Sequence, residues 1–300
     1  EKTIFEENVF GFDIKYNNNM EKEAIDVEEL KVDDSKVIPL KDKFLQLMRE
    51  EELDEKEVRP VICDDDDDSY NFVRRCLIAS NNNEKKAYKL GVEGIRWRSK
   101  IKPRKITLDD THFPNKNIFT HSHHALAMCH TNTKDGNNNN QNPVVYIKLD
   151  VWNPRKFSTD EYEILLAFIL ETCLKAQQQD PSTKNEEGSK RGQVYLVFDM
   201  RKMSKFNIDL PKIAILAKFA SVYYPESCVG VAIHADFVTQ ILWNFISPLI
   251  DKRTRDRVSI FGGDNDNYED FLEHHIGKTT TQLDELSPLS SDTLQDYVAK

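Results

Sequence analysis

Short apolar runs recur along the second half of the chain and predict the strands of a sheet. They cover residues 144–149, 193–198, 229–235 and 257–261, and several are apolar at nearly every position. Runs of this length without polar alternation are typical of strands that are buried on both faces. We therefore expect these segments to form the interior of one sheet.

Longer segments between these runs carry apolar stripes at helical spacing. Residues 158–175 begin with Ser158 and Glu161, three positions apart, which is the pattern of an N-terminal capping box. A second segment, residues 210–222, ends before a proline, and a third covers residues 237–250. Because strands and helices alternate, the pattern predicts βαβ crossovers and a mainly parallel sheet in an α/β fold.

The N-terminal third of the chain shows a different, helical pattern. One stripe predicts a helix over residues 40–52, and two further helices are expected between residues 69 and 100. The acidic run at residues 64–68 fits a solvated loop better than a metal site. We predict an acidic, partly disordered segment, a small helical N-terminal module, an α/β domain and a C-terminal tail, at residues 1–68, 69–105, 106–277 and 278–300.

The segment 237–250 is apolar over most of its circumference and carries no charge. A surface helix normally buries one apolar stripe. This segment has two, which are Phe237, Ile241, Phe245 and Leu249, and Val238, Leu242 and Ile246. Two interpretations stay open: a crossover helix buried on both sides, or a gating helix that covers a lipid cavity and contacts a membrane when open.

Charge and composition narrow the classes of function. The formal net charge of −10 argues against general nucleic-acid binding, which needs clustered basic residues. No run approaches the roughly 20 apolar residues that span a bilayer. The 5 cysteines are widely spaced, as expected for reduced thiols in a cytoplasmic protein.

Motifs for catalysis or metal binding are weak. The sequence has no glycine-rich phosphate loop and no nucleophile elbow, so we do not expect an enzyme. His121, His123, His124, Cys129 and His130 gather in one stretch, but nothing else supplies a matched set of ligands. We interpret this stretch as a polar loop that leads into a strand, and we expect no metal and no cofactor beyond a bound lipid.

Residues 194–262 resemble the CRAL-TRIO domain of the phosphatidylinositol transfer proteins. Residues 223–226, Tyr-Tyr-Pro-Glu, match the family's Tyr-Pro-Glu element. Residues 233–237 stand where the family has Asn-Ala-Pro followed by an aromatic residue, and further matches extend the resemblance over residues 69–275. The resemblance implies a single lipid, often phosphatidylinositol, held between a sheet floor and a mobile helix.

The resemblance also implies residues for the lipid headgroup. The family's inositol-phosphate contacts fall on Glu226, on Arg257 in place of a lysine, and on Ser80 in place of an arginine. A hydroxyl pair that some members use for choline phospholipid falls on Ser204 and Phe206, so only half of it is kept. The expected headgroup residues are therefore Glu226, Arg257 and Ser204.

The expected lipid cavity lies between the gating helix and the sheet. On the sheet side we expect Val194, Leu196, Phe198 and Ile233 or their alternates. The full set of cavity and lid residues is Phe198, Phe206, Ile233, Phe237, Ile241, Leu242, Phe245 and Ile246.

As a function, the resemblance implies that the protein binds one lipid and transfers or presents it at membranes. The expected ligand is a phospholipid such as phosphatidylinositol, and the expected location is the cytoplasm with peripheral, transient attachment to a membrane surface. Two alternatives stay open. One is the same fold carrying a sterol, an isoprenoid or haem; the other is a scaffold or regulatory module that transfers nothing.

Overall fold

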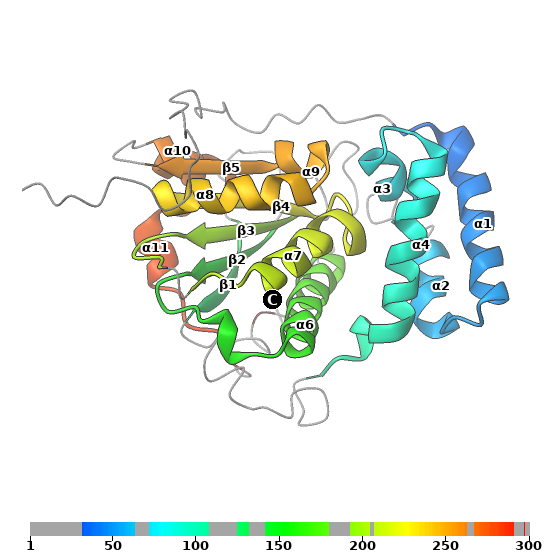
Figure 1. The fold of residues 1–300 in the computed structure, drawn as a ribbon, viewed down its shortest axis with the longest axis horizontal. Helices are drawn as coiled ribbons and strands as arrows, with labels where there is room; N and C mark the ends of the chain where they lie inside the picture. The colour runs from blue at the N-terminus through cyan, green and yellow to red at the C-terminus, as the bar shows by residue number, and fades with distance from the viewer. Residues whose placement is uncertain are drawn as a thin grey trace, which may run out of the picture.

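A five-stranded sheet forms the centre of the computed structural model, which describes residues 32–63, 72–107, 125–131, 142–179, 193–204, 207–262, 267–290 and 297 (Figure 1). The strands are β1 (Leu126–His130), β2 (Pro143–Lys148), β3 (Val194–Asp199), β4 (Cys228–Ala235) and β5 (Val258–Gly262). They lie side by side in chain order. β2 to β5 are parallel, and β1 pairs antiparallel with β2 at the edge. The predicted α/β class and mainly parallel sheet are confirmed.

Three crossover helices connect the parallel strands and cover one face of the sheet. They are α6 (Thr159–Gln179), α7 (Leu210–Lys218) and α8 (Phe237–Ile246). The predicted capping box is present at the start of α6, where the Ser158 amide donates to Glu161 at 2.7 Å and the Glu161 amide donates to Ser158 at 3.2 Å. Because strand order advances in one direction, right-handed crossovers place all three helices on the same side.

The connections after α7 and α8 are short and irregular. A π-helical turn, Phe219–Tyr223, follows α7, and a 3₁₀ turn, Ser247–Leu249, follows α8. The short helix α9 (Lys252–Asp256) then leads into β5. On the opposite face, α10 (Asn267–His275) and α11 (Thr280–Asp284) pack against the sheet.

A bundle of four helices precedes the sheet in sequence and lies beside α6 and α7 (Figure 1). Its helices are α1 (Val37–Glu50), α2 (Glu55–Cys63), α3 (Phe72–Ala79) and α4 (Glu84–Ile101). Phe44 of α1, Ile62 of α2, Leu77 of α3 and Ile95 of α4 share one hydrophobic core. The boundary placed at residue 69 therefore separates α2 from α3, although both helices contribute to that core.

A buried polar contact joins this bundle to the sheet domain. Arg98 of α4 pairs with Glu171 of α6 at 2.8 Å, and the Tyr224 hydroxyl donates to the same carboxylate at 2.8 Å. Trp97 stacks on Tyr223 with ring centroids 4.3 Å apart. A buried ion pair of this kind fixes geometry more than it adds stability. The bundle is thus held in a defined position against the turn that precedes β4.

Candidate functional site: an apolar cavity under helix α8

An apolar cavity of about 200 Å³ lies between the sheet and the crossover helices. Alternate residues of the four parallel strands line its floor, because side chains of a strand point to opposite faces with a period of two. These residues are Val145, Ile147, Leu196, Phe198, Gly230, Ala232, Val258 and Ile260. Larger hollows on the N-terminal bundle are more open and lined largely by charged residues such as Lys56 and Glu84. The cavity under α8 is therefore the site suited to a hydrophobic ligand.

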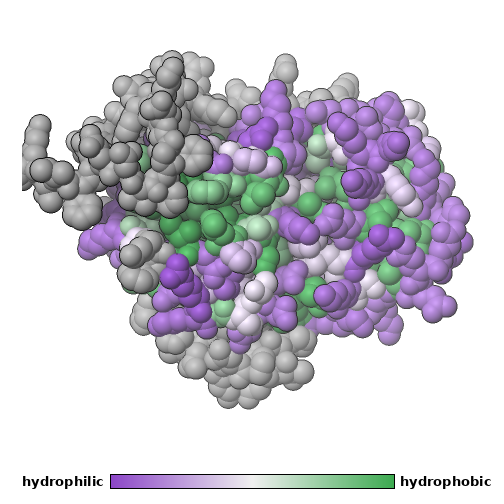
Figure 2. All heavy atoms as spheres, in the orientation of Figure 1, coloured by the Kyte–Doolittle hydropathy of each residue, from purple (hydrophilic) through white to green (hydrophobic). Residues whose placement is uncertain are grey.

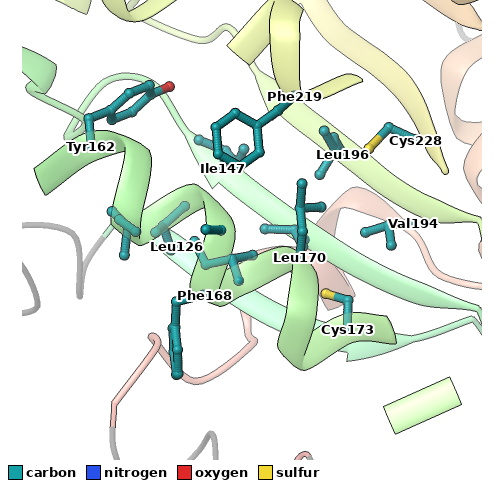
Figure 3. Packing of buried hydrophobic residues seen from close by; sticks show 14 of the residues in the cluster. Leu126, Ile147, Tyr162, Phe168, Leu170, Cys173, Val194, Leu196, Phe219 and Cys228 are labelled. Atoms are coloured by element: carbon teal, nitrogen blue, oxygen red, sulfur yellow. The ribbon is translucent and has the colours of Figure 1, made fainter. Parts of the chain in front are cut away.

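The strand register decides which predicted residues reach this cavity. Phe198 and Leu196 line it, as expected. Val194 belongs to the same hydrophobic core without lining the cavity (Figure 3). Ile233 was predicted wrongly, because Ala232 faces the cavity and its neighbour Ile233 packs in the core on the opposite face. Phe206 lies outside the described residues.

Helix α8 presents its two apolar stripes to different surroundings. Leu242 and Ile246 of the second stripe line the cavity. Phe237 and Phe245 of the first stripe are 46% and 55% exposed. Ile241 is partly buried and does not line the cavity. Figure 2 shows hydrophobic side chains gathered on this face over α8.

A break in strand β4 sets the direction in which α8 leaves the sheet. The pairing of β4 with β5 shifts register between Ala232 and Ala235, and His234 between them has a φ of 55°. Such a bulge bends a strand and re-aims the chain beyond it. Asp236 then caps α8 by accepting from the Thr239 amide at 3.0 Å. This aspartate replaces the family's proline and serves the helix start.

A buried charged cluster lies at the amino ends of β4 and β5. Glu226 pairs with Arg257 at 3.0 Å and with Arg253 at 3.1 Å. Beside it, the Arg75 guanidinium donates to the Ser227 hydroxyl at 2.6 Å. We call Arg75, Glu226, Arg253 and Arg257 the arginine cluster. The predicted proximity of Glu226 and Arg257 is confirmed.

The arginine cluster has unused hydrogen-bond donors. Arg257 is 8% exposed, and its Nε and Nη1 atoms have no hydrogen-bond partner among the described residues. Burial lowers the pKa of Arg257, although Glu226 partly opposes this change. Thr254, which follows Arg253, and Val258, which follows Arg257, both line the cavity. The cluster therefore lies next to one end of the cavity.

Sequence comparison alone missed two members of this cluster. Arg253 precedes Arg257 by one helical turn, so the spacing of the two arginines was the available signal. Arg75 comes from α3, and only the packing of the bundle brings it to Ser227. Ser80 stands where the family has an arginine, yet the helical bundle still supplies a guanidinium to Ser227, the residue after Glu226.

Ser204 lies away from the other predicted headgroup residues. It follows the carboxyl end of β3, whereas Glu226 and Arg257 precede the amino ends of β4 and β5. Because these strands are parallel, the two positions lie at opposite ends of the strands. The Ser204 hydroxyl donates to Asn207 at 2.8 Å. The three residues expected at the headgroup are thus not brought together.

Two further expectations concern metals and membranes. In the described part of the chain, no three His, Cys, Asp or Glu side chains are grouped as metal ligands. Cys129 and His130 lie in β1, while His121, His123 and His124 fall outside the described residues. None of the described helices is long and apolar enough to cross a membrane.

Three comparisons relate this chain to known proteins. The family model described as CRAL/TRIO domain matches residues 128–281. The CRAL-TRIO domain-containing protein T23G5.2 of Caenorhabditis elegans is 28% identical over 38% of this chain and 16% of its own length. The CRAL-TRIO domain-containing protein C3H8.02 of Schizosaccharomyces pombe is 24% identical over 71% of this chain and 44% of its own length. The chain thus spans less than half of each of these relatives.

The architecture agrees with a solved structure. The crystal structure of Sfh5 matches with a TM-score of 0.59 and 13% sequence identity, over 90% of this chain and 96% of that one. At this identity the match shows the fold alone. The family model covers half of the chain and includes residues 194–262, where the motifs of the resemblance lie. The chain belongs to the CRAL/TRIO family of lipid-binding and lipid-transfer domains.

Proposed function

We propose that this protein binds a phospholipid with an anionic headgroup, such as phosphatidylinositol, and transfers or presents it at membranes. The observation that carries the proposal is the arginine cluster at the end of the apolar cavity. The guanidinium groups of Arg253 and Arg257 pair there with one carboxylate, that of Glu226, and the guanidinium of Arg75 donates to the neighbouring Ser227. A lipid held with its chains in the cavity would place its phosphate near these groups.

Buried charge explains why an anion suits this place. Removing a charged group from water is costly unless partners satisfy it, and Glu226 leaves Nε and Nη1 of Arg257 without acceptors among the described residues. A phosphate offers several oxygens and pairs with guanidinium groups through charge-assisted hydrogen bonds. A phosphate here would therefore both balance the charge and fill the missing hydrogen bonds.

The size of the cavity bears on how the lipid enters. Its volume of about 200 Å³ is below the roughly 300–1,000 Å³ of typical ligand pockets. Two acyl chains therefore require α8 to move outward. Each Å² of apolar surface that leaves water contributes about 25 cal/mol, so a lipid with long chains offsets the cost of that movement.

The exposed stripe of α8 supports docking at a membrane. Phe237, Phe245 and Leu249 are 46%, 55% and 56% exposed, and α8 carries no charged side chain. A helix with an apolar outer face binds at the interface between headgroups and acyl chains. Contact with a membrane would therefore stabilise the outward position of α8 that lipid exchange needs.

The proposal is tested by substitution of Arg257, whose Nε and Nη1 donors have no partner among the described residues. Arg257→Gln keeps a polar side chain beside Glu226 and removes the charge. Lys252→Gln, at an exposed position of α9, the short helix that Arg257 directly follows, is the matched control. We expect Arg257→Gln to reduce transfer of phosphatidylinositol between vesicles about tenfold or more, and the control to leave it unchanged.

Two results would contradict the proposal. Unchanged phosphatidylinositol transfer in folded Arg257→Gln would remove the arginine cluster from headgroup binding. Organic extracts of the purified protein that contain no lipid, together with no transfer of any lipid, would favour the scaffold instead. A melting curve of each variant verifies that it is folded.

A further inference from the structure

A groove of about 910 Å³ lies on the N-terminal bundle and shares no lining residue with the cavity under α8. Figure 1 shows α2, which forms one wall of the groove, at the right of the view and α8 at the left. The lining residues of α2 recur at each turn of that helix, so the groove runs along its length. We call this surface the basic groove, and its lining residues are Asp54, Glu55, Lys56, Arg59, Pro60, Cys63 and Lys105.

A chain reversal after α4 brings two lysines to the start of α2. Lys102 follows α4 with a φ of 54°, in the left-handed region, and Pro103 begins a 3₁₀ turn that ends at Lys105. The ammonium groups of Lys102 and Lys105 pair with the Asp54 carboxylate at 3.0 and 3.3 Å. Glycine or asparagine is favoured where a helix ends in this way. A lysine at this strained position therefore adds positive charge to the groove at a conformational cost.

Two carboxylates balance these two lysines. The Lys102 and Lys105 ammonium groups lower the pKa of Asp54 to about 2, so Asp54 stays ionised at neutral pH. Glu57, which is 2% exposed, lies 3.9 Å from Lys105. Any surplus charge in the groove therefore comes from other residues.

The surplus comes from cations on α2, on α6 and around the turn after α4. Arg59 pairs with Glu55 one turn earlier, whereas exposed Lys56 has no salt bridge among the described residues. Lys175 of α6 donates to a backbone carbonyl of the turn at 3.4 Å, which adds its charge there. Residues 96–105 include six basic and no acidic side chains, in a chain whose formal net charge is −10. Positive charge is therefore gathered here against the average of the chain.

Helix electrostatics accounts for part of this charge and not for all of it. Cations near the C-terminus of α4 are favourable because they face the negative end of the helix dipole. Lys56 lies in the first turn of α2, where acidic residues are preferred and positive charge is unfavourable. An exposed lysine without a salt bridge at that position points to an external anion.

We propose that the basic groove binds an acidic segment of a partner protein in an extended conformation. The nine residues of α2 rise about 13.5 Å, the length of about four residues of an extended chain. Carboxylates two positions apart in such a chain are about 6.6 Å apart. Lys56 and Arg59 are three positions apart on α2, which separates their Cβ atoms by about 5–6 Å. Neutral residues between the acids would contact Pro60, Cys63 and the aliphatic stems of the basic side chains.

A flat bilayer fits this groove less well than a single chain does. Asp54 and Glu55 also line the groove and would repel a uniformly anionic surface. A chain of alternating acidic and neutral residues places its carboxylates against the cations and keeps neutral side chains beside Asp54 and Glu55. Because the groove and the cavity under α8 share no residue, this inference does not rest on the proposed function.

The test compares two peptides that differ in charge alone. One alternates aspartate with alanine, and the other has asparagine in place of each aspartate. Fluorescence anisotropy should show that the unmodified protein binds the aspartate peptide about tenfold or more tightly than the asparagine peptide. This preference should fall severalfold as salt is raised, since the Debye length shortens from about 30 Å at 0.01 M to about 10 Å at 0.1 M.

A thiol in the groove reports where the peptide binds. Cys63 is partly exposed and lines the groove. Cys129, which is also partly exposed, lies in β1 of the sheet domain and is the internal control. The aspartate peptide should slow alkylation of Cys63 by N-ethylmaleimide severalfold and leave alkylation of Cys129 unchanged, as measured by mass spectrometry of digested protein.

A charge reversal at Lys56 tests the contact itself. An acidic residue suits the first turn of α2, so Lys56→Glu should fold as well as the unmodified protein. It should weaken binding of the aspartate peptide about tenfold, since repulsion replaces attraction. Lys89→Glu is the control, because Lys89 is exposed on α4, about 20 Å along the helix from Lys102, and the net charge changes equally. This control should leave binding unchanged.

Other results would contradict the inference. Equal affinity for the two peptides, no protection of Cys63, or unchanged binding in Lys56→Glu would remove the acidic segment from this groove. Vesicles of phosphatidylserine that bind through Lys56, when the aspartate peptide does not, would make a membrane the occupant. Binding of the peptide only after the aspartates at residues 64–68 are replaced by asparagine would make the chain's own acidic run the occupant.

Discussion

The two faces of the sheet are built from alternate residues of the same strands, yet among the described residues one face lines an apolar cavity and the other packs into a core. On the face under α10 and α11, Val144, Tyr146, Val197, Val231 and Ile233 are fully buried in a closed core. On the other face, a cavity of about 200 Å³ lies between the strands and α8. Small residues contribute to this difference, since Gly230 and Ala232 stand on the open face. The strands therefore support two functions at once, a rigid core and a ligand site.

The faces also differ in how their covering helices are attached. On the closed face, Arg201 pairs with Asp284 of α11 at 2.7 Å, and the Tyr146 hydroxyl donates to Asp199 at 2.8 Å. On the open face, the side-chain hydrogen bonds of α8 in the described structure stay within its own first turn, between Asp236 and Thr239. At its carboxyl end, α8 is tied to α9, where Arg255 donates to the Ser247 carbonyl at 2.8 Å. Side-chain hydrogen bonds and ion pairs join α11 to the sheet, whereas α8 meets the sheet through apolar contacts. The helix without polar side-chain bonds to the sheet is the one suited to move.

The sharpest test of this contrast removes one apolar side chain from each face. Ile233→Ala opens a hole in the closed core and should lower the free energy of unfolding by about 2–5 kcal/mol. Leu242→Ala, on partly exposed α8, should cost less than half as much because its side chain already borders empty space. Urea denaturation measures both. Equal losses would mean that the two faces are packed equally well.

A second test fills the open face. Ala232→Leu directs additional side-chain volume into the cavity, so lipid binding should fall about tenfold or more. Stability should change by less than about 1 kcal/mol, since the new side chain enters space that is already present. Mass spectrometry of lipid extracts and a melting curve give the two readings. A folded variant that retains its lipid would place the ligand elsewhere.

The sequence predicted the sheet well because buried parallel strands leave a local signal. Each of the predicted strands at residues 144–149, 193–198, 229–235 and 257–261 lies within one residue of an observed strand at both ends. The capping box at Ser158 was equally local. The edge strand β1 was not assigned bounds, because its five residues follow a polar stretch. The helix α2 was missed because its segment is acidic and contains Pro60.

The site was harder to predict because it depends on which alternate strand residues face the cavity and on contacts between residues far apart in the sequence. A run that is apolar at every position does not reveal which alternate residues face which side, so Ile233 was assigned to the wrong face. The arginine cluster joins residues from α3 and α9, and the Arg75–Ser227 contact spans 152 positions. Burial, which the sequence does not show directly, is what makes these groups informative.

A third test separates the two stripes of α8. Phe245→Asp places a charge on the exposed stripe and should leave the melting temperature nearly unchanged while reducing transfer between vesicles about tenfold, because one aromatic contact with the membrane is lost. Leu242→Asp places the same charge in the cavity and should destabilise the fold. If both variants unfold, α8 is a buried crossover helix; if both transfer normally, it is not a gate.

The smallest expected effect concerns the attachment of α11 and its dependence on pH. Burial alone would raise the pKa of Asp199 and of Asp284, but hydrogen bonds from Arg201 outweigh it, so both pKa values are lowered. A carboxyl group whose pKa is lower in the folded state adds stability above its unfolded pKa of about 3.9, and this stability is lost as the pH falls through the folded pKa. Arg201→Met should therefore lower the free energy of unfolding by about 1 kcal/mol at neutral pH. The value is modest because the Arg201 side chain is partly exposed. The difference between the variant and the unmodified protein should shrink as the pH falls from about 5 towards 2, when both carboxylates become protonated. Urea denaturation at several pH values measures this, and Lys202→Met, on the neighbouring exposed residue, is the control. A constant difference across that range would show that Arg201 holds α11 through packing of its aliphatic stem rather than through its charge.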